Sequence, residues 1–163
     1  METLLWFETL GVSIWIRETP SLLAYPLILA LHGVGLAWLV GLNAVVDARL
    51  LGFAPSLTLD QLAKFFPIMV VAFWVNAITG VILTLAYAST MLTNPALYVK
   101  LLCIALAVVV LRMIKTRFLN NPSNLESDAG GAKVLAIVSV VAWMGAIVTG
   151  RLMAYVHLII DMG

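Results

Sequence analysis

The sequence predicts an all-α integral membrane protein: an antiparallel four-helix transmembrane bundle with an N-terminal interfacial amphipathic helix. Of its 163 residues, 63% are apolar and only 10% are charged, and the mean hydropathy is +1.10. Soluble domains are nearer half apolar and a quarter charged, so this composition cannot supply a water-facing surface. Four windows of about 20 mostly apolar residues, the length that a bilayer requires, lie between polar segments. We expect a single transmembrane domain over residues 1–163.

The interfacial helix is expected over residues 1–19. At helical period this segment has one apolar flank opposite its acidic and basic residues, and Trp6 and Trp15 would lie at headgroup depth. It lacks the positive start and the small-residue cleavage site of a secretory signal, so we expect it in the mature protein. Pro20 then ends the helix before the first span.

The four spans follow from the apolar windows. They are expected at about 21–46, 65–87, 98–114 and 134–160. The first begins either at Ser21 or at Pro26, because proline is favoured at the first helical position. Residues 118–132 contain Asn, Ser, Pro and paired Gly without an apolar period, which predicts a flexible cytoplasmic loop.

Basic residues predict the orientation. Six of the nine Lys and Arg residues fall in two of the connections between spans. They are Arg49 and Lys64 in the first connection, and Arg112, Lys115, Arg117 and Lys133 in the third. Since short loops rich in Lys and Arg stay in the cytoplasm, we expect both termini on the opposite, periplasmic side.

Several classes of function find no support in the sequence. The formal net charge of +1 gives no basic excess for a phosphate backbone, which argues against nucleic acid as a partner. The single cysteine, Cys103, cannot form an intramolecular disulfide, and no Cys and His residues have zinc-site spacing. Nucleotide-binding glycine loops and hydrolase motifs are also absent from the sequence. The lipid bilayer is the partner that the composition does predict.

His32 is the first candidate for chemistry, because an ionisable residue inside a span needs a partner or a task. Its stripe of the helical wheel is mixed in polarity and is predicted to face the bundle interior; the stripe holds Tyr25, Ile28, Gly35, Leu39, Asn43 and Asp47. Gly33 and Gly35 would let a helix or a flat ligand approach closely. His32 is then either a neutral imidazole bonded across the bundle, or an axial ligand of b-type haem or a donor to a quinone carbonyl.

Arg151 is the second candidate, in the fourth span with Tyr155 on the same face. The apolar body of the spans holds no carboxylate to pair with it, so its guanidinium is either structural or meets a haem propionate or an anionic headgroup. His157 lies six residues further, about 120° around the helix, and is either interfacial or a metal ligand beside His32. The two imidazoles approach one level only if the first span begins at Pro26.

Other polar residues in the spans have simpler interpretations. Lys100, at the start of the third span, is interpreted as an interfacial lysine whose ammonium reaches the headgroups. Asn76, Thr79 and Gly80 in the second span are interpreted as interhelical hydrogen bonding and close packing.

Three segments carry a family likeness: WIRETPSLLAYPLILALHGVGLAWLVGLNAVVDARLLG, TNPALYVKLL and AWMGAIVTGRLMAY. Their distinctive residues are His32, Asp47 with Arg49, Asn94 with Pro95 and Lys100, and Gly150 and Arg151 followed by Tyr155. Over most of its length the chain thereby resembles small uncharacterised four-helix bacterial inner-membrane proteins, loosely similar in pattern to copper-resistance D-type membrane proteins. The resemblance implies a bundle in the bacterial inner (cytoplasmic) membrane that carries haem or serves a redox complex. Copper transport itself is poorly supported, since Met144 and Met153 are isolated.

These observations predict a non-catalytic membrane subunit that binds b-type haem or quinone and passes electrons to or from a partner, within a complex or homo-oligomer. The expected cofactor-binding residues are His32, Gly35, Asn43, Arg151 and Tyr155, and the expected metal ligands are His32 and His157. The alternative is a cofactor-free structural accessory subunit of a larger membrane complex.

Overall fold

The computed structural model describes the backbone of residues 2–160 and the side chains of residues 3–153. Within that part the chain is helical and contains no strand, which confirms the all-α class. The long helices are α3 (Tyr25–Leu51), α5 (Phe66–Ala86), α7 (Pro95–Ile114) and α9 (Ala129–Ile160). The short helices are α1 (Glu2–Glu8), α2 (Gly11–Glu18), α4 (Leu59–Ala63), α6 (Ala88–Met91) and α8 (Asn124–Ser127), and a π-helical turn, η1 (Lys115–Leu119), continues α7. Four segments of the described chain are long and apolar enough to cross a membrane.

Local sequence signals set the ends of the long helices. α3 begins at Tyr25 with Pro26 in its first turn, beside the later of its two expected starts. It ends at Leu51 and is capped by Gly52, whose φ is 94°. Pro95 opens α7, where the Asn94 side chain accepts a hydrogen bond from the Ala96 amide at 2.9 Å. These caps fix the level at which each polar side chain enters the bundle.

Two boundaries differ from those expected. α3 continues past Asp47 to Leu51, because Asp47 is buried against α9 and Arg49 Nε donates to the Leu57 carbonyl at 2.6 Å. α9 begins at Ala129, where Asp128 accepts from the Gly131 amide at 2.9 Å. The segment 118–132, expected to be a loop, therefore includes the end of η1, all of α8 and the first turn of α9.

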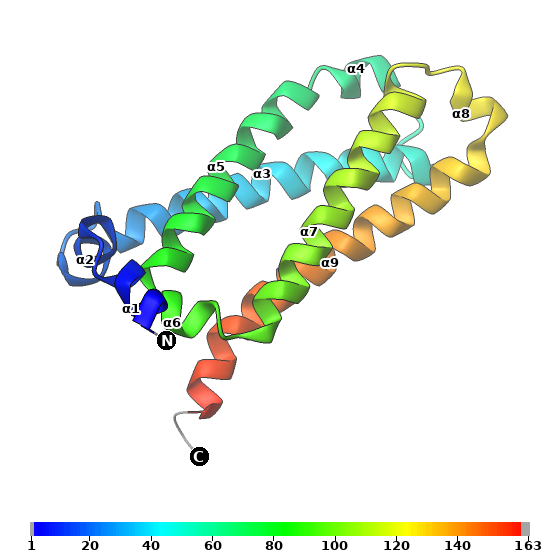
Figure 1. Cartoon of the computed structure of the whole chain (residues 1–163). Helices are drawn as coiled ribbons and strands as arrows, with labels where there is room; N and C mark the ends of the chain where they lie inside the picture. Colours follow the sequence, from blue (N-terminus) through cyan, green and yellow to red (C-terminus); the bar gives the residue numbers. More distant parts are fainter. Residues whose placement is uncertain (1, 161–163) are drawn as a thin grey trace.

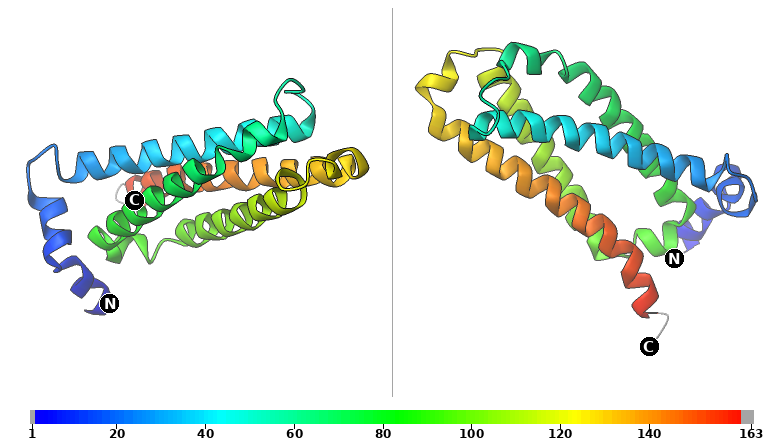
Figure 2. Two further views of the ribbon diagram at one scale, coloured as in Figure 1. Left: turned by 90° about the horizontal axis from the view of Figure 1, so that it is seen from above. Right: turned by 180° about the vertical axis from the view of Figure 1, so that it is seen from behind.

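The N-terminal segment forms two helices where one was expected, with the break at Thr9 and Leu10. α1 and α2 pack against the end of α5 and against α6, which Figures 1 and 2 show at the same end of the molecule. Ser13 and Ile16 of α2 are buried there, and Ser13 Oγ donates to the Phe7 carbonyl at 2.9 Å.

An acidic side chain fastens this end. Glu8 Oε1 accepts from the Ser89 amide at 2.8 Å and from Ser89 Oγ at 2.6 Å. Its Oε2 lies 3.1 Å from Arg17 Nη1, and Arg17 Nη2 donates to the Glu8 carbonyl at 2.8 Å. The hydrogen bonds from Ser89, and then the charge of Arg17, hold the pKa of Glu8 below its ordinary value.

The four long helices contact one another unequally. α3 packs along α5, α7 packs along α9, and the two pairs meet where α3 lies against α9. α5 and α7 run side by side in Figure 1 but hardly contact each other. The α3–α5 and α7–α9 connections, marked by α4 and α8, lie at one end of the bundle, so the six basic residues of these connections gather there.

Candidate functional site

A cavity of about 430 Å³ lies along the side where α5 and α7 fail to meet. Its lining is mostly apolar and includes Phe73, Val81, Leu97, Leu101 and Trp143. The polar side chains among its lining residues are His32, Asn76, Thr84 and Lys100. An apolar cavity of this size with a few convergent polar groups is typical of small-molecule sites, which run from about 300 to 1,000 Å³.

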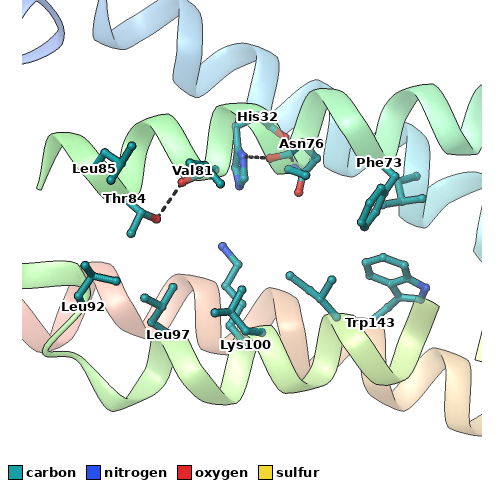
Figure 3. A pocket seen from close by; sticks show the side chains of 15 residues that line it. His32, Phe73, Asn76, Val81, Thr84, Leu85, Leu92, Leu97, Lys100 and Trp143 are labelled. Atoms are coloured by element: carbon teal, nitrogen blue, oxygen red, sulfur yellow. Dashed lines mark hydrogen bonds between the residues drawn. The ribbon is translucent and has the colours of Figure 1, made fainter. Parts of the chain in front are cut away.

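His32 reaches the cavity from α3, and α5 orients its ring (Figure 3). Its Nδ1 lies 3.0 Å from the Asn76 carbonyl oxygen and 3.1 Å from Thr79 Oγ1. A carbonyl can only accept, so Nδ1 carries the proton and donates it. In the neutral ring Nε2 is then the nitrogen with a free lone pair, and it has no hydrogen-bond partner among the described residues.

The close packing of α3 on α5 sets the orientation of the His32 ring. A Cβ added to Gly35 would lie 3.2 Å from both the Ala72 carbonyl oxygen and the Asn76 amide nitrogen, so the glycine permits the helices to approach. Asn76 Nδ2 donates to the His32 carbonyl at 2.7 Å. A Cβ added to Gly80 would lie 3.0 Å from His32 Cε1, so the ring occupies the space above this glycine.

Lys100 enters the same cavity from α7. Figure 3 shows its ammonium directed across the cavity toward His32. Its stem passes Gly150 of α9, where an added Cβ would lie 3.6 Å from Nζ. Within the described part of the chain Nζ makes no ion pair, since the one pair found there joins Arg17 to Glu8. The cavity therefore holds a lysine side chain opposite an imidazole.

Sequence reasoning interpreted Lys100 as interfacial and so missed its place in the cavity. A signal was available in the spacing, because Leu97, Leu101 and Ile104 lie three residues before, one after and four after Lys100, and all four line the cavity. Residues at this spacing lie on one face of a helix. What the spacing alone could not show is that this face turns toward α3 and α5.

The remaining expected site residues are dispersed. Gly35 lies in the α3–α5 contact, and Asn43 is buried between α3 and α9. Arg151 is exposed on α9 and does not line the cavity. The side chains of Tyr155 and His157 lie outside the described residues. The structure thus places His32 with Asn76, Thr79 and Lys100, and apart from Arg151.

Over the residues that the structure describes, no group of three or more His, Cys, Asp or Glu side chains could hold a metal ion. Comparison of the chain with protein-family models, with characterised proteins and with solved structures finds no match.

Proposed function

We propose that this chain is an antiparallel four-span membrane protein that binds a quinone in the α5–α7 cavity and passes electrons to or from a partner protein. The observation that carries the proposal is the pair of His32 and Lys100, which face each other across an otherwise apolar cavity. A quinone head group is a flat apolar ring with carbonyl oxygens, and it needs polar partners of this kind at its edges.

The two side chains suit both redox states of a quinone. The Lys100 ammonium can donate to a carbonyl oxygen of the oxidised form. Nε2 of neutral His32 can accept a hydrogen bond from a hydroxyl of the reduced form, which has gained two electrons and two protons. Phe73 and Trp143 provide aromatic surface in the same lining, where a ring can pack. Neither residue supplies electrons, so we assign that task to a partner.

The location of the cavity supports loading from the bilayer. α5 and α7 hardly contact each other, so the cavity lies on the lateral face of the bundle. Large apolar side chains are exposed on both helices, among them Val71 and Leu102 at 63% and 71%, which suits contact with lipid tails. We infer a bacterial inner membrane with both termini in the periplasm, which puts the basic α4 and α8 end in the cytoplasm and His32, two turns into α3, nearer the periplasm.

Haem b fits the same residues less fully. His32 Nε2 would ligate the haem iron, with its Nδ1 held by a backbone carbonyl as metal-bound histidines usually are, and Lys100 would pair with a propionate. Bound haem would supply one-electron transfer. The described lining contains a single imidazole, and Arg151, which was expected to meet a propionate, lies outside the cavity. The quinone therefore accounts for more of the site.

A binding titration tests the proposal. The purified protein in lipid nanodiscs is titrated with decylubiquinone and with a short-chain menaquinone, and tryptophan quenching is followed, with Trp143→Phe identifying the cavity signal. We expect saturable binding that weakens about tenfold or more in His32→Leu and in Lys100→Met. Lys133→Met, which removes an exposed cation at the other end of α9, is the matched control.

The same sample distinguishes quinone binding from haem binding and from a structural role without a cofactor. Haemin is added and the dithionite-reduced visible spectrum is recorded for wild type and His32→Ala. A sharp b-type band that depends on His32, without quinone binding, would replace the quinone by haem. Absence of both signals would leave the cofactor-free structural subunit.

A further inference from the structure

A second buried polar group lies between α3 and α9, apart from the cavity. It consists of Asn43 and Asp47, one turn apart on α3, and Ser139 of α9, which are 0%, 1% and 0% exposed. None of the three lines the α5–α7 cavity. Quinone binding in the cavity makes no use of them, so any role of this polar group is independent of it.

Two of the three hydrogen bonds of this group meet at one oxygen. Asp47 Oδ2 accepts from Asn43 Nδ2 at 2.7 Å and from Ser139 Oγ at 2.8 Å. Asn43 Nδ2 also donates to Ser139 Oγ at 2.7 Å. Two acceptors remain buried without a partner, Asp47 Oδ1 and Asn43 Oδ1. Unpartnered acceptors in two fully buried side chains indicate that a donor belongs at this point.

No cation of the described chain neutralises Asp47, because its one ion pair is Arg17 with Glu8. The elements around the group carry the basic residues Arg49, Lys64, Arg112, Lys115, Arg117 and Lys133, and none of their nitrogens lies within 4.0 Å of the Asp47 carboxyl. Arg49 donates to the Leu57 carbonyl, and Lys115 Nζ lies 3.7 Å over the Phe66 ring. The adjoining core residues are apolar. An unpaired carboxylate here would be a costly buried charge.

We propose that Asp47 is a proton-binding site, with the proton on Oδ1 donated to Asn43 Oδ1. The carboxyl and the carboxamide are already joined by the bond from Asn43 Nδ2 to Asp47 Oδ2. One proton closes the second half of this acid–amide pair, gives both unpartnered oxygens a hydrogen bond and removes the charge. Ser139 remains as the donor that anchors the pair to α9.

Other occupants explain less. A metal cation needs several oxygen ligands, whereas the group leaves two oxygens free and the helical carbonyls nearby are engaged in the helices. A water molecule could bond both oxygens and the indole nitrogen of Trp143, one turn from Ser139 and also buried without a partner. Water alone, however, leaves the carboxylate charge in place.

Infrared spectroscopy tests the protonation directly. The carbonyl stretch of a protonated carboxylic acid is separate from the bands of an ionised carboxylate. In nanodiscs at neutral pH we expect this band in the wild type, its loss in Asp47→Asn, and its retention in the control Asp60→Asn, whose side chain is exposed on α4. Identical spectra for wild type and Asp47→Asn in this region would show that Asp47 is ionised and would overturn the proposal.

Thermal unfolding gives a second, independent readout. Asparagine at position 47 imitates the protonated acid, because its carboxamide accepts at one atom and donates to Asn43 Oδ1 at the other. Asp47→Asn should therefore keep Tm within about 2 °C, while Asp47→Ala should lower it by about 5 °C or more. Equal losses in the two variants would contradict the proposal. A Tm of the wild type that rises with sodium but not with choline, and does not rise in Asp47→Asn, would show a metal cation in place of the proton.

Discussion

The α3–α9 side and the α5–α7 side of this bundle are both built from apolar helices, yet the first is closed and the second holds a cavity. On α9, small residues recur at intervals of three and four, and Ala132, Ala136 and Ser139 are each 0% exposed. They let α3 approach, and Asn43 and Asp47 bond across the contact. On the opposite side Phe73 and Leu101 line the space between helices that hardly touch.

The difference shows that small residues and shared hydrogen bonds decide which helices meet. Lipid tails are as apolar as leucine, so apolar faces alone provide little drive for one helix to leave lipid for another. The α5–α7 side also has small residues, Ala77 and Gly80, but no hydrogen bond joins α5 to α7 in the described chain. Such a side can stay open at little cost, since lipid or a ligand can fill it. Four predictions test this contrast.

The largest effect is expected from breaking a closed side. Gly35→Leu places a side chain where even a Cβ lies 3.2 Å from the α5 backbone, whereas Gly33 has nothing within 4 Å. Overpacking of this kind costs about 1–3 kcal/mol. We expect a clear fall in Tm for Gly35→Leu in detergent and little change for Gly33→Leu. Equal Tm values for the two variants would mean that α3 and α5 do not approach as closely as described.

Filling the open side should act in the opposite way. Ala77 lines the cavity, so Ala77→Phe should abolish quinone binding while Tm stays unchanged or rises, because the new ring occupies empty apolar space. Ala105→Phe, on the exposed face of α7, is the control and should bind normally. A large fall in Tm in Ala77→Phe would show that the cavity is too small to hold the added ring.

A smaller effect is expected at Gly80 of α5, which lies against the His32 ring at the edge of the cavity. Gly80→Ala would bring a Cβ to 3.0 Å from His32 Cε1, so the imidazole has to turn slightly. A displaced hydrogen bond worth about 1 kcal/mol corresponds to roughly fivefold weaker quinone binding. Titration of Gly41→Ala, where an added Cβ meets nothing, supplies the reference. Unaltered affinity in Gly80→Ala would argue that the orientation of His32 is unimportant.

Composition and periodicity were enough to predict the four long apolar helices. They also singled out His32, since an imidazole within an apolar run is conspicuous without any knowledge of packing. Both features are local, and the structure places His32 at the cavity. Its role there stays a prediction.

The positions of Lys100, Arg151 and Asp47 depend on how the helices pack, and local sequence patterns could not show them. Lys100 faces His32 because α7 lies close along α9, where a Cβ added to Gly145 would be 2.9 Å from Cys103 Sγ. Arg151 suggested an interior site by its charge alone, but helical period does not distinguish the lipid face from the interior, and the residue is exposed. The expected first span stops before Asp47, because hydropathy windows end at ionisable residues even where the side chain is buried.

The smallest effect is expected at α6, at one end of the α5–α7 side. α6 links α5 to α7, and Glu8 ties α1 to it through Ser89. The ionised carboxylate is stabilised in the folded protein, so its pKa lies below the ordinary value. Its contribution is therefore complete above the ordinary pKa, at about pH 5 and higher, and is lost as the pH falls through the lowered folded value.

Hydrogen exchange measures this loss. We expect the amides of α1 and α2 to lose protection as the pH falls below the ordinary pKa of glutamate, relative to Glu8→Gln at the same pH, because that variant has no charge to lose. The total should be about 1 kcal/mol or less, since a pair near the surface contributes little. Glu18→Gln, which removes an exposed carboxyl at the end of α2, is the control and should lose protection with acid as the wild type does. If protection falls with acid equally in Glu8→Gln, the hydrogen bonds between Glu8 and Ser89 do not keep α1 and α2 in place. The apolar contact of Ile16 must then be what closes this end of the α5–α7 side.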